Sequence, residues 1–389
     1  MSANAASLRG STRTRLTLDP TMIGLTAALL LLGLVMVTSA SVTLAARDGD
    51  PFFFLERQLL FSLVGVGCAA IVMRIPTTTW ERLGHPLLVV SLVLLVMVLV
   101  PGVGHQVNGS RRWLRLAGLN FQASEAARVL LLIYLCSYLV RREEEVRQSW
   151  MGFLKPILVL GVAALLLLVE PDFGSGVVLL ATGIGVMFLA GVKLRHFLAL
   201  CAAGAVVLGA VAVSSAYRVK RLTAFLDPWA DPFNTGFQLT QSLIAIGRGE
   251  WFGVGLGASI QKLFYLPEAH TDFVFAVLAE ELGFVGIAVV VLLVLALAYR
   301  ALMIARAAAE AGLKFQSYLA AAFGIWFGLQ AFINMGVNMG LLPTKGLTLP
   351  LLSYGRSSLL VTLGWIGIVL RVHHETANTK SVALRSAAR

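Results

Sequence analysis

The chain has 389 residues, of which 58% are apolar and only 13% are charged, and its mean hydropathy is +0.84. A soluble domain carries roughly 25% charged residues, so this composition excludes a water-soluble globule, although the length alone would suit two or three soluble domains. It also excludes a disordered chain, a coiled coil and a disulfide-rich secreted scaffold. The composition therefore predicts an all-α polytopic membrane protein.

The net charge of +11 does not indicate a nucleic-acid partner, because the basic residues are scattered between apolar segments. An anionic membrane surface and basic cytoplasmic loops explain these charges better. The three cysteines, Cys68, Cys136 and Cys201, lie in apolar runs without metal-ligand spacing, so we expect them to be small core residues.

Ten apolar segments are candidates for spanning helices, each of which needs roughly 20 residues. They are residues 21–46, 57–74, 84–101, 122–140, 155–170, 174–192, 195–216, 273–299, 315–341 and 354–371. The first segment exceeds the roughly 7–15 apolar residues of a cleaved signal, so we expect it to be retained.

These segments predict a cytoplasmic tail at 1–20, a membrane domain at 21–371 and a mobile cytoplasmic tail at 372–389. Of the 31 Lys and Arg residues, 18 lie in segments predicted to face the cytoplasm, 12 in segments predicted to face outward, and Arg128 within a span. This bias favours cytoplasmic termini.

The longest segment between spans is the 55-residue loop 217–271, which separates spans seven and eight. Long loops without secondary structure are uncommon unless they are functional or disordered, and this loop is rich in aromatic residues. Because aromatic side chains beside a bilayer prefer the headgroup region, we expect short helices at the outer membrane surface. Loops 102–121 and 342–353 are predicted to face the same side.

Ionisable residues within spans are costly and are usually paired or functional. Glu125 and Arg128 share one face of span four at spacing i, i+3. They either neutralise each other as a structural pair or tune a polar cavity. Glu280 and Glu281 lie in span eight, where we expect them to pair with a polar group of another span.

Asp272 directly precedes span eight, and its position suits two roles equally well. It is either the N-cap of the helix or a carboxylate that faces the outer membrane surface beside His270 and Glu268. The nearby run from Gly253 to Gly257 resembles a phosphate loop, but it lacks a preceding strand, so we expect flexible or tightly packed backbone there.

Several strings resemble the SEDS family, the shape, elongation, division and sporulation proteins. They are WLRLAGLNFQASE at 113–125, EPDFG at 170–174, FQLTQSLIAIGRG at 237–249, LPEAHTDFVFAVLAEELG at 266–283 and LLPTKGLTLPLLSYG at 341–355. The similarity covers most of the chain in order. The string PTKGLTLP is more similar to the cell-division branch than to the elongation branch. The family pattern YGGSS is here YGRSS, which places a cation, Arg356, where the family keeps bare backbone.

The resemblance implies a peptidoglycan glycosyltransferase of the cytoplasmic membrane that polymerises lipid II on the outer face during septal cell-wall synthesis. It implies a class B penicillin-binding protein and other division-complex membrane proteins as partners. The family's essential acid falls on Asp272, as a base or as a metal ligand, and its intramembrane pair falls on Glu125 and Arg128. No organic cofactor is implied, and a divalent cation is an open alternative.

Polar residues near the outer surface are candidates for binding the substrate and its pyrophosphate. They are Arg218, Lys220, Arg221, Arg248, Lys262, Lys345, His270, Gln238 and Gln241. A lipid II flippase is the main alternative function, with an elongation-type polymerase and a non-catalytic scaffold as further ones. The concentration of polar residues at the outer face, in place of a continuous path through the midplane, favours chemistry over transport.

Overall fold

The computed structural model describes residues 16–387 except positions 48, 108–109, 117–118, 215–218, 220–222, 224 and 344–345. Its helices and strands are α1 (Pro20–Arg47), α2 (Phe53–Val72), α3 (Thr77–Arg82), α4 (Gly84–Leu99), β1 (Gly104–Val107), β2 (Ser110–Leu116), β3 (Leu119–Gln122), α5 (Ala123–Arg141), α6 (Glu143–Gln148), α7 (Trp150–Val169), α8 (Phe173–Leu189), α9 (Leu194–Val213), α11 (Phe237–Gly249), α12 (Val274–Glu310), α13 (Lys314–Asn338) and α14 (Arg356–Ala387).

Within these residues, seven helices are long and apolar enough to cross a membrane, namely α1, α2, α5, α7, α12, α13 and α14. Three shorter apolar helices, α4, α8 and the first part of α9, coincide with the remaining predicted segments. The prediction of a helical, polytopic membrane protein is therefore confirmed. The count of ten spans stays a prediction, because α4 and α8, with 16 and 17 residues, fall below the roughly 20 residues of a full span.

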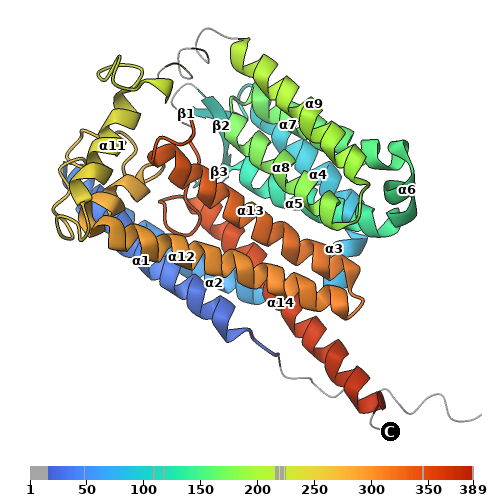
Figure 1. Ribbon diagram of the computed structural model, residues 1–389. Coiled ribbons are helices and arrows are strands. Elements are labelled where there is room, and N and C mark those ends of the chain that lie inside the picture. Colours follow the sequence, from blue (N-terminus) through green and yellow to red (C-terminus); the bar gives the residue numbers. More distant parts are fainter. Residues whose placement is uncertain are drawn as a thin grey trace, which may run out of the picture.

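The helices form two groups that α13 joins (Figure 1). In one group α12 and α2 pack against α1, and α14 packs against α2, whereas in the other α4, α7 and α8 pack around α5. Helix α13 contacts α12 on one side and α8 on the other. Residues of α5 and α13 are mostly buried, 83% and 72% in their apolar windows, against 17% for α2. Helices α5 and α13 are thus central, and α2 presents its apolar surface to lipid.

The predicted outer loop at 102–121 is not helical but folds into a three-stranded antiparallel sheet of order β1-β2-β3. In the pairing of β2 with β3, Trp113 lies opposite Gln122 and Leu114 opposite Phe121. Strand β3 continues directly into α5, so the sheet fixes the residues at the start of that central helix. An all-α prediction missed this element, because its strands are short and polar enough to resemble a loop.

Helix α12 contains a break at Gly283, which has a φ of 64°. A break inside a membrane frees backbone groups that must find new partners, and the segment after α11 supplies them. The amide of Val254 donates to the carbonyl of Glu280 at 2.9 Å, and the amide of Phe284 donates to the carbonyl of Glu250 at 2.9 Å. The predicted outer loop therefore contains a helix, α11, and docks on α12 as ordered structure.

Gly253 and Gly283 make this docking tight. A Cβ at Gly283 would lie 2.4 Å from the backbone nitrogen of Gly253, and a Cβ at Gly253 would lie 2.1 Å from the carbonyl oxygen of Glu281. Gly253 also has a positive φ of 79°. Of the two interpretations of the glycine run, tightly packed backbone is the correct one at this position.

The tail from residue 372, expected to be mobile, continues α14 as helix to Ala387. Polar contacts hold its first turn. The carboxylate of Glu375 accepts hydrogen bonds from the amide of Thr77 at 3.0 Å and from Nε of Arg371 at 2.7 Å. The backbone amide of Thr17 donates to Nδ1 of His374 at 3.1 Å. The expectation of a mobile tail is thus wrong for these residues, because their polar side chains bind other elements.

Candidate active site

Asp272 lies in a turn that two asparagines of α13 hold in place. Asn334 and Asn338 donate from Nδ2 to the main-chain carbonyl of Asp272 at 2.9 and 3.1 Å. Asn334 also donates to the carbonyl of Leu347 at 2.5 Å, which ties the segment after α13 to the same point. A Cβ at Gly346 would lie 2.9 Å from Oδ2 of Asp272. The carboxylate therefore lies against bare backbone, in a turn with a fixed geometry.

The structure excludes one of the two interpretations of Asp272, that of a helix N-cap. The N-cap of α12 is Phe273, without a side-chain capping bond. In the same turn, Oγ1 of Thr271 donates to the carboxylate of Glu268 at 2.7 Å. Asp272 is therefore not the helix cap, and a role of its carboxylate toward a substrate stays a prediction.

The α7–α8 turn brings two further carboxyl groups, Glu170 and Asp172, to this end of the bundle. The carboxylate of Asp172 accepts from Oγ of Ser124 at 3.1 Å and from the amide of Ser175 at 3.2 Å, which caps α8. The two carboxylate oxygens of Glu170 are buried and have no hydrogen-bond partner among the described residues. The turn thus holds one well-hydrogen-bonded carboxylate beside one that is not.

Arg112 of β2 reaches across to the same turn. Its Nε donates to the carbonyl of Glu170 at 3.2 Å and its Nη2 to the carbonyl of Pro171 at 2.6 Å. Both acceptors are neutral carbonyls, so these bonds do not neutralise the guanidinium. Its positive charge therefore acts on the carboxyl groups nearby. Its field acts on Glu170 and on Asp272 alike.

The pKa of Asp272 is raised from its ordinary value to about 7. Burial, which disfavours the charged form, is the largest cause. The neighbouring charge of Glu268 raises the pKa further, Arg112 lowers it, and Asp172 raises it. Burial and Asp172 likewise raise the pKa of Glu170 to about 8. A carboxyl group with a pKa near neutrality suits proton transfer at physiological pH.

The intramembrane pair forms as expected. Nη2 of Arg128 lies 2.5 Å from Oε2 of Glu125, and both side chains are buried in α5. The guanidinium carbon of Arg128 is 5.1 Å from the ring centroid of Trp326 on α13, and its Nε and Nη1 have no hydrogen-bond partner among the described residues. Mutual neutralisation is observed, whereas the role of the pair in a polar cavity stays a prediction.

Two predicted substrate-binding cations are engaged elsewhere. Nζ of Lys262 is 2.8 Å from the carboxylate of Glu281 and 3.0 Å from Oγ of Ser39 on α1. Arg248 is 2.8 Å from the carboxylate of Glu280, but its side chain keeps 39% exposure. Lys262 is thus a buried structural partner of a carboxylate, which corrects the expectation of a free substrate-binding cation. Arg248 retains a solvent-facing side.

Glu280 and Glu281 have the polar partners that we expected, but most of these come from the loop and not from another span. Ser259 donates from Oγ to Glu280, and the amide of Ile260 donates to it at 3.0 Å. The exception is Ser39 of α1, whose Oγ lies 2.7 Å from Glu281. The two carboxylates therefore tie the outer loop to α12.

Other predicted residues lie around the Asp272 turn or outside the described part. The ring of His270 packs 4.7 Å from Phe54 and 5.7 Å from Tyr354, measured between centroids. Gln238 and Gln241 lie partly buried on α11, which reaches this turn through a 2.8 Å bond from Oγ of Ser242 to the carbonyl of Asn338. Four predicted cations, Arg218, Lys220, Arg221 and Lys345, lie outside the described residues.

Sequence analysis missed Arg112, Glu170 and Asp172 as site residues. The EPDFG string was quoted for the family resemblance, but its two acids were not assigned to the site. Arg112 was counted only among the external cations, because its direction depends on a strand that was not predicted. Successive side chains of a strand point to opposite faces. Arg111 is therefore exposed, whereas Arg112 points toward the α7–α8 turn; a strand prediction would have distinguished the two.

Replacing Arg112 with Gln is expected to raise the pKa of Asp272, because a cation that favours the ionised carboxylate is lost. If Asp272 acts as a base, the acid limb of the pH–rate profile then moves to higher pH. The fractional loss of activity is then largest near pH 6–7, and any loss that persists at higher pH measures a separate role of the guanidinium as a cation beside the substrate. The pH dependence of glycan polymerisation measures this shift, and Arg111→Gln, an exposed neighbour on the same strand, is the matched control. An unchanged limb in Arg112→Gln would contradict the electrostatic link.

No group of three or more His, Cys, Asp or Glu side chains in the described part of the chain is arranged to hold a metal.

Comparison with known proteins identifies the relatives of this arrangement. Residues 20–378 match the FtsW/RodA/SpoVE family model, described as "Cell cycle protein". The chain is 59% identical over 353 residues to a probable peptidoglycan glycosyltransferase FtsW of Thioalkalivibrio sulfidiphilus, covering 90% of this chain and 88% of the relative. It is 54% identical to the protein of the same description from Halorhodospira halophila, covering 95% and 93%.

Solved structures show the same fold. A chain from a study of the structural coordination of polymerization and crosslinking by a peptidoglycan synthase complex is 33% identical, with a TM-score of 0.77 and coverage of 93% of this chain and 99% of the other. The rod shape determining protein RodA of Thermus thermophilus is 30% identical, with a TM-score of 0.69 and coverage of 92% and 98%. These matches confirm the family resemblance found in the sequence. The chain belongs to the FtsW/RodA/SpoVE family of cell cycle proteins.

Proposed function

We propose that the chain is a peptidoglycan glycosyltransferase that polymerises lipid II, a disaccharide-pentapeptide on undecaprenyl pyrophosphate. The observation that carries this proposal is the Asp272 carboxylate. Two asparagines hold its turn at one end of a membrane-embedded bundle, and its pKa is about 7. The high identity to proteins described as probable peptidoglycan glycosyltransferases supports the same reaction.

In the proposed reaction, the 4-hydroxyl of one sugar attacks the anomeric carbon of another. Asp272 takes the hydroxyl proton as the new C–O bond forms, and the bond from the anomeric carbon to the pyrophosphate oxygen breaks. The lipid pyrophosphate leaves with the electron pair. One displacement inverts the anomeric centre. Because the pyrophosphate leaves as a stable anion and needs no general acid, one base suffices, unlike the carboxylate pair of most glycoside hydrolases.

Cations near the turn stabilise the negative charge that develops on the leaving pyrophosphate. We assign this role first to Arg112, whose described hydrogen bonds go to neutral carbonyls, and to the exposed side of Arg248. Further candidates for the same role are the loop cations Arg218, Lys220, Arg221 and Lys345.

The sugar or peptide of the substrate is proposed to contact His270, Gln238 and Gln241. No step requires a metal. In the alternative role of this carboxylate, Asp272 would hold a divalent ion, which would offset the negative charge of the leaving group.

The proposal includes a cellular setting. The apolar helices and the relatives place the chain in the inner membrane as a multi-pass protein. We propose that both termini are cytoplasmic, so that the Asp272 end faces outward, and that the protein works at the division septum. The similarity to a chain of a peptidoglycan synthase complex that couples polymerisation to crosslinking supports a class B penicillin-binding protein as partner. Other division-complex membrane proteins are expected to bind as well.

Polymerisation of lipid II by the purified chain in detergent tests the function, alone and with the penicillin-binding protein. Glycan strands formed without a bilayer would support the enzyme and exclude a role limited to flipping lipid II. Transport of lipid II across vesicle membranes, with no glycan under any condition, would favour the flippase. Activation of the partner with no polymerase activity of this chain would favour the scaffold.

A further inference from the structure

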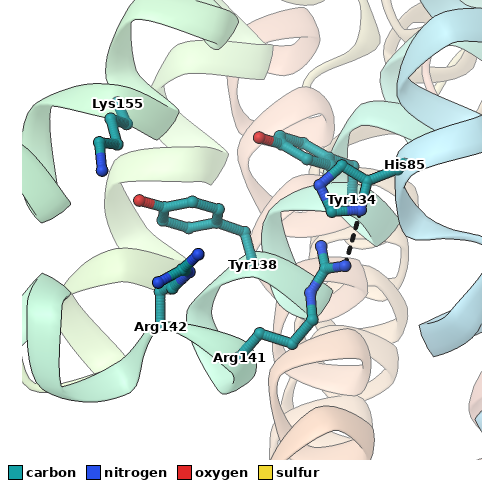
Figure 2. Close-up of a pocket in the computed structure, with 6 residues that line it drawn as sticks. All are labelled: His85, Tyr134, Tyr138, Arg141, Arg142 and Lys155. Atoms are coloured by element: carbon teal, nitrogen blue, oxygen red, sulfur yellow. Dashed lines mark hydrogen bonds between the residues drawn. The ribbon is translucent and has the colours of Figure 1, made fainter.

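A second polar site lies at the end of the bundle opposite Asp272. Helix α5 begins next to the Ser124–Asp172 hydrogen bond and ends at Arg141, about 28 Å away at 1.5 Å per residue. At that far end, α4, α5 and α7 enclose a cavity of about 280 Å³ (Figure 2). It is lined by His85, Tyr134, Tyr138, Arg141, Arg142 and Lys155.

The cavity has a surplus of positive charge. Arg142 and Lys155 share the carboxylate of Glu145, at 2.7 and 3.5 Å. Arg141 has no ion pair with any residue that the structure describes. Three cations therefore meet one carboxylate, and an anion is the complementary ligand.

The contact between Arg141 and His85 adds a donor. Nη1 of Arg141 lies 2.7 Å from Nδ1 of His85, as the dashed line in Figure 2 marks. Because a guanidinium can only donate, Nδ1 of His85 must accept, and its proton is on Nε2. The other ring nitrogen, Nε2, is then the N–H donor of His85. The second bond of Arg141, from Nε to the carbonyl of Ser137 at 3.3 Å, fixes the guanidinium.

A second hollow adjoins the first, with a volume of about 350 Å³ and a lining of Thr78, Glu81, Arg82 and Arg141. Arg141 lines both hollows. The second hollow is lined by an acid, Glu81, as well as by two cations, whereas no acid among the described residues lines the first, so the first is the stronger anion site. Two adjoining hollows that share one guanidinium suit a ligand with two phosphates better than a ligand with one.

Apolar surface beside the cavity distinguishes a lipid from a soluble anion. Helix α4, which carries His85, exposes 60% of Val89, and α7, which carries Lys155, exposes 59% of Leu158. Met151, one turn before Lys155, is 66% exposed. When the headgroup phosphate of a lipid occupies the cavity, its acyl chains can cover these apolar side chains. A free phosphate ion in the same cavity would leave the apolar side chains uncovered.

We propose that this cavity binds the phosphodiester headgroup of an anionic phospholipid, at the membrane surface opposite the catalytic carboxylate. Arg141, Arg142 and Lys155 pair with the phosphate, and His85 adds a hydrogen bond. Basic pockets between membrane helices on the cytoplasmic side are recurrent sites for such headgroups. Cardiolipin, with two phosphates, is expected to bind more tightly than phosphatidylglycerol, and zwitterionic phosphatidylethanolamine least.

Native mass spectrometry of the full chain in detergent, titrated with each of the three lipids, tests the proposal. Near an anionic lipid each Lys or Arg contributes enough for about a fivefold change in affinity. We therefore expect Lys155→Gln to weaken cardiolipin binding about fivefold and Arg141→Gln with Lys155→Gln about 25-fold. Glu145→Gln, which frees Arg142 and Lys155, should strengthen binding about fivefold.

Arg306→Gln removes an exposed cation near the end of α12 and is the matched control, with cardiolipin affinity expected to stay at the wild-type value. Equal binding of all three lipids would overturn the proposal, as would an equal loss in Arg306→Gln and Lys155→Gln. Displacement of cardiolipin by inorganic phosphate at equal concentration would assign the cavity to a soluble anion. Lys155→Gln and Glu145→Gln change exposed side chains, so they test the site even if the double variant does not fold.

Discussion

Asp272→Asn is expected to reduce lipid II polymerisation by ~10²–10⁴-fold or more, because the amide cannot accept the proton of the attacking hydroxyl. The wild-type rate should rise with pH through about 7, the pKa of the carboxyl group, and fall tenfold per pH unit well below it.

Because burial raises the pKa of Asp272 above its value in the unfolded chain, ionisation of this residue disfavours the folded state at neutral pH. The Asn variant should therefore unfold at no lower temperature than the wild type.

Glu268→Gln is the matched control in the same turn. Its carboxylate raises the pKa of Asp272, so its removal should move the acid limb to lower pH and keep the enzyme active. This shift is opposite to the one expected for Arg112→Gln. Measuring the polymerisation rate of wild type and Asp272→Asn at increasing divalent metal concentration distinguishes the two roles of Asp272. If Asp272 is a metal ligand, the wild-type rate depends on metal, whereas if it is a base, the rate does not. Normal polymerisation by Asp272→Asn in detergent would contradict both roles.

Glu281→Ala is expected to destabilise the folded protein by about 3–5 kcal/mol, because it leaves the ammonium of Lys262 buried without its counter-charge. The side chains of Lys262 and Glu281 are 4% and 0% exposed, and they are 2.8 Å apart. Thermal unfolding in detergent measures the loss. The second substitution Lys262→Met in the same chain should restore most of it, because the unpaired charge is then gone.

Glu310→Ala is the control for this experiment. Its ion pair with Arg306 is exposed on both sides, and solvent screens such pairs, so no measurable change in unfolding is expected. Equal unfolding temperatures for Glu281→Ala and Glu310→Ala would show that the ionic contact between the loop and α12 does not stabilise the fold.

The membrane architecture was predictable because the length of an apolar run sets the position of a spanning helix. Each predicted segment coincides with an apolar helix of the structure. The sheet β1-β2-β3 was not predictable in the same way, since its strands are short and its residues polar. The helical extension of α14 depends on contacts with Thr17 and Thr77, far away in the sequence, which local composition cannot reveal.

The candidate site was only partly predictable. Spacing alone left Asp272 with two equal roles, and the family resemblance, not the residue pattern, indicated the catalytic one. The spacing of Glu125 and Arg128 predicted their ion pair correctly, because both belong to one helix. Arg112 and Asp172 were missed as site residues because they approach Asp272 only through tertiary structure. For the same reason Lys262 was expected to be free, although Glu281 neutralises it.

The contact of Gly253 with Gly283 has a consequence for genetics. A larger residue at either position meets backbone atoms at 2.1–2.4 Å and not a side chain that could be shortened. Compensation normally arises when a neighbouring side chain becomes smaller, but the atoms met here belong to the main chain, which no substitution removes. A loss-of-function allele at either position should therefore yield true revertants and no intragenic suppressor at the other.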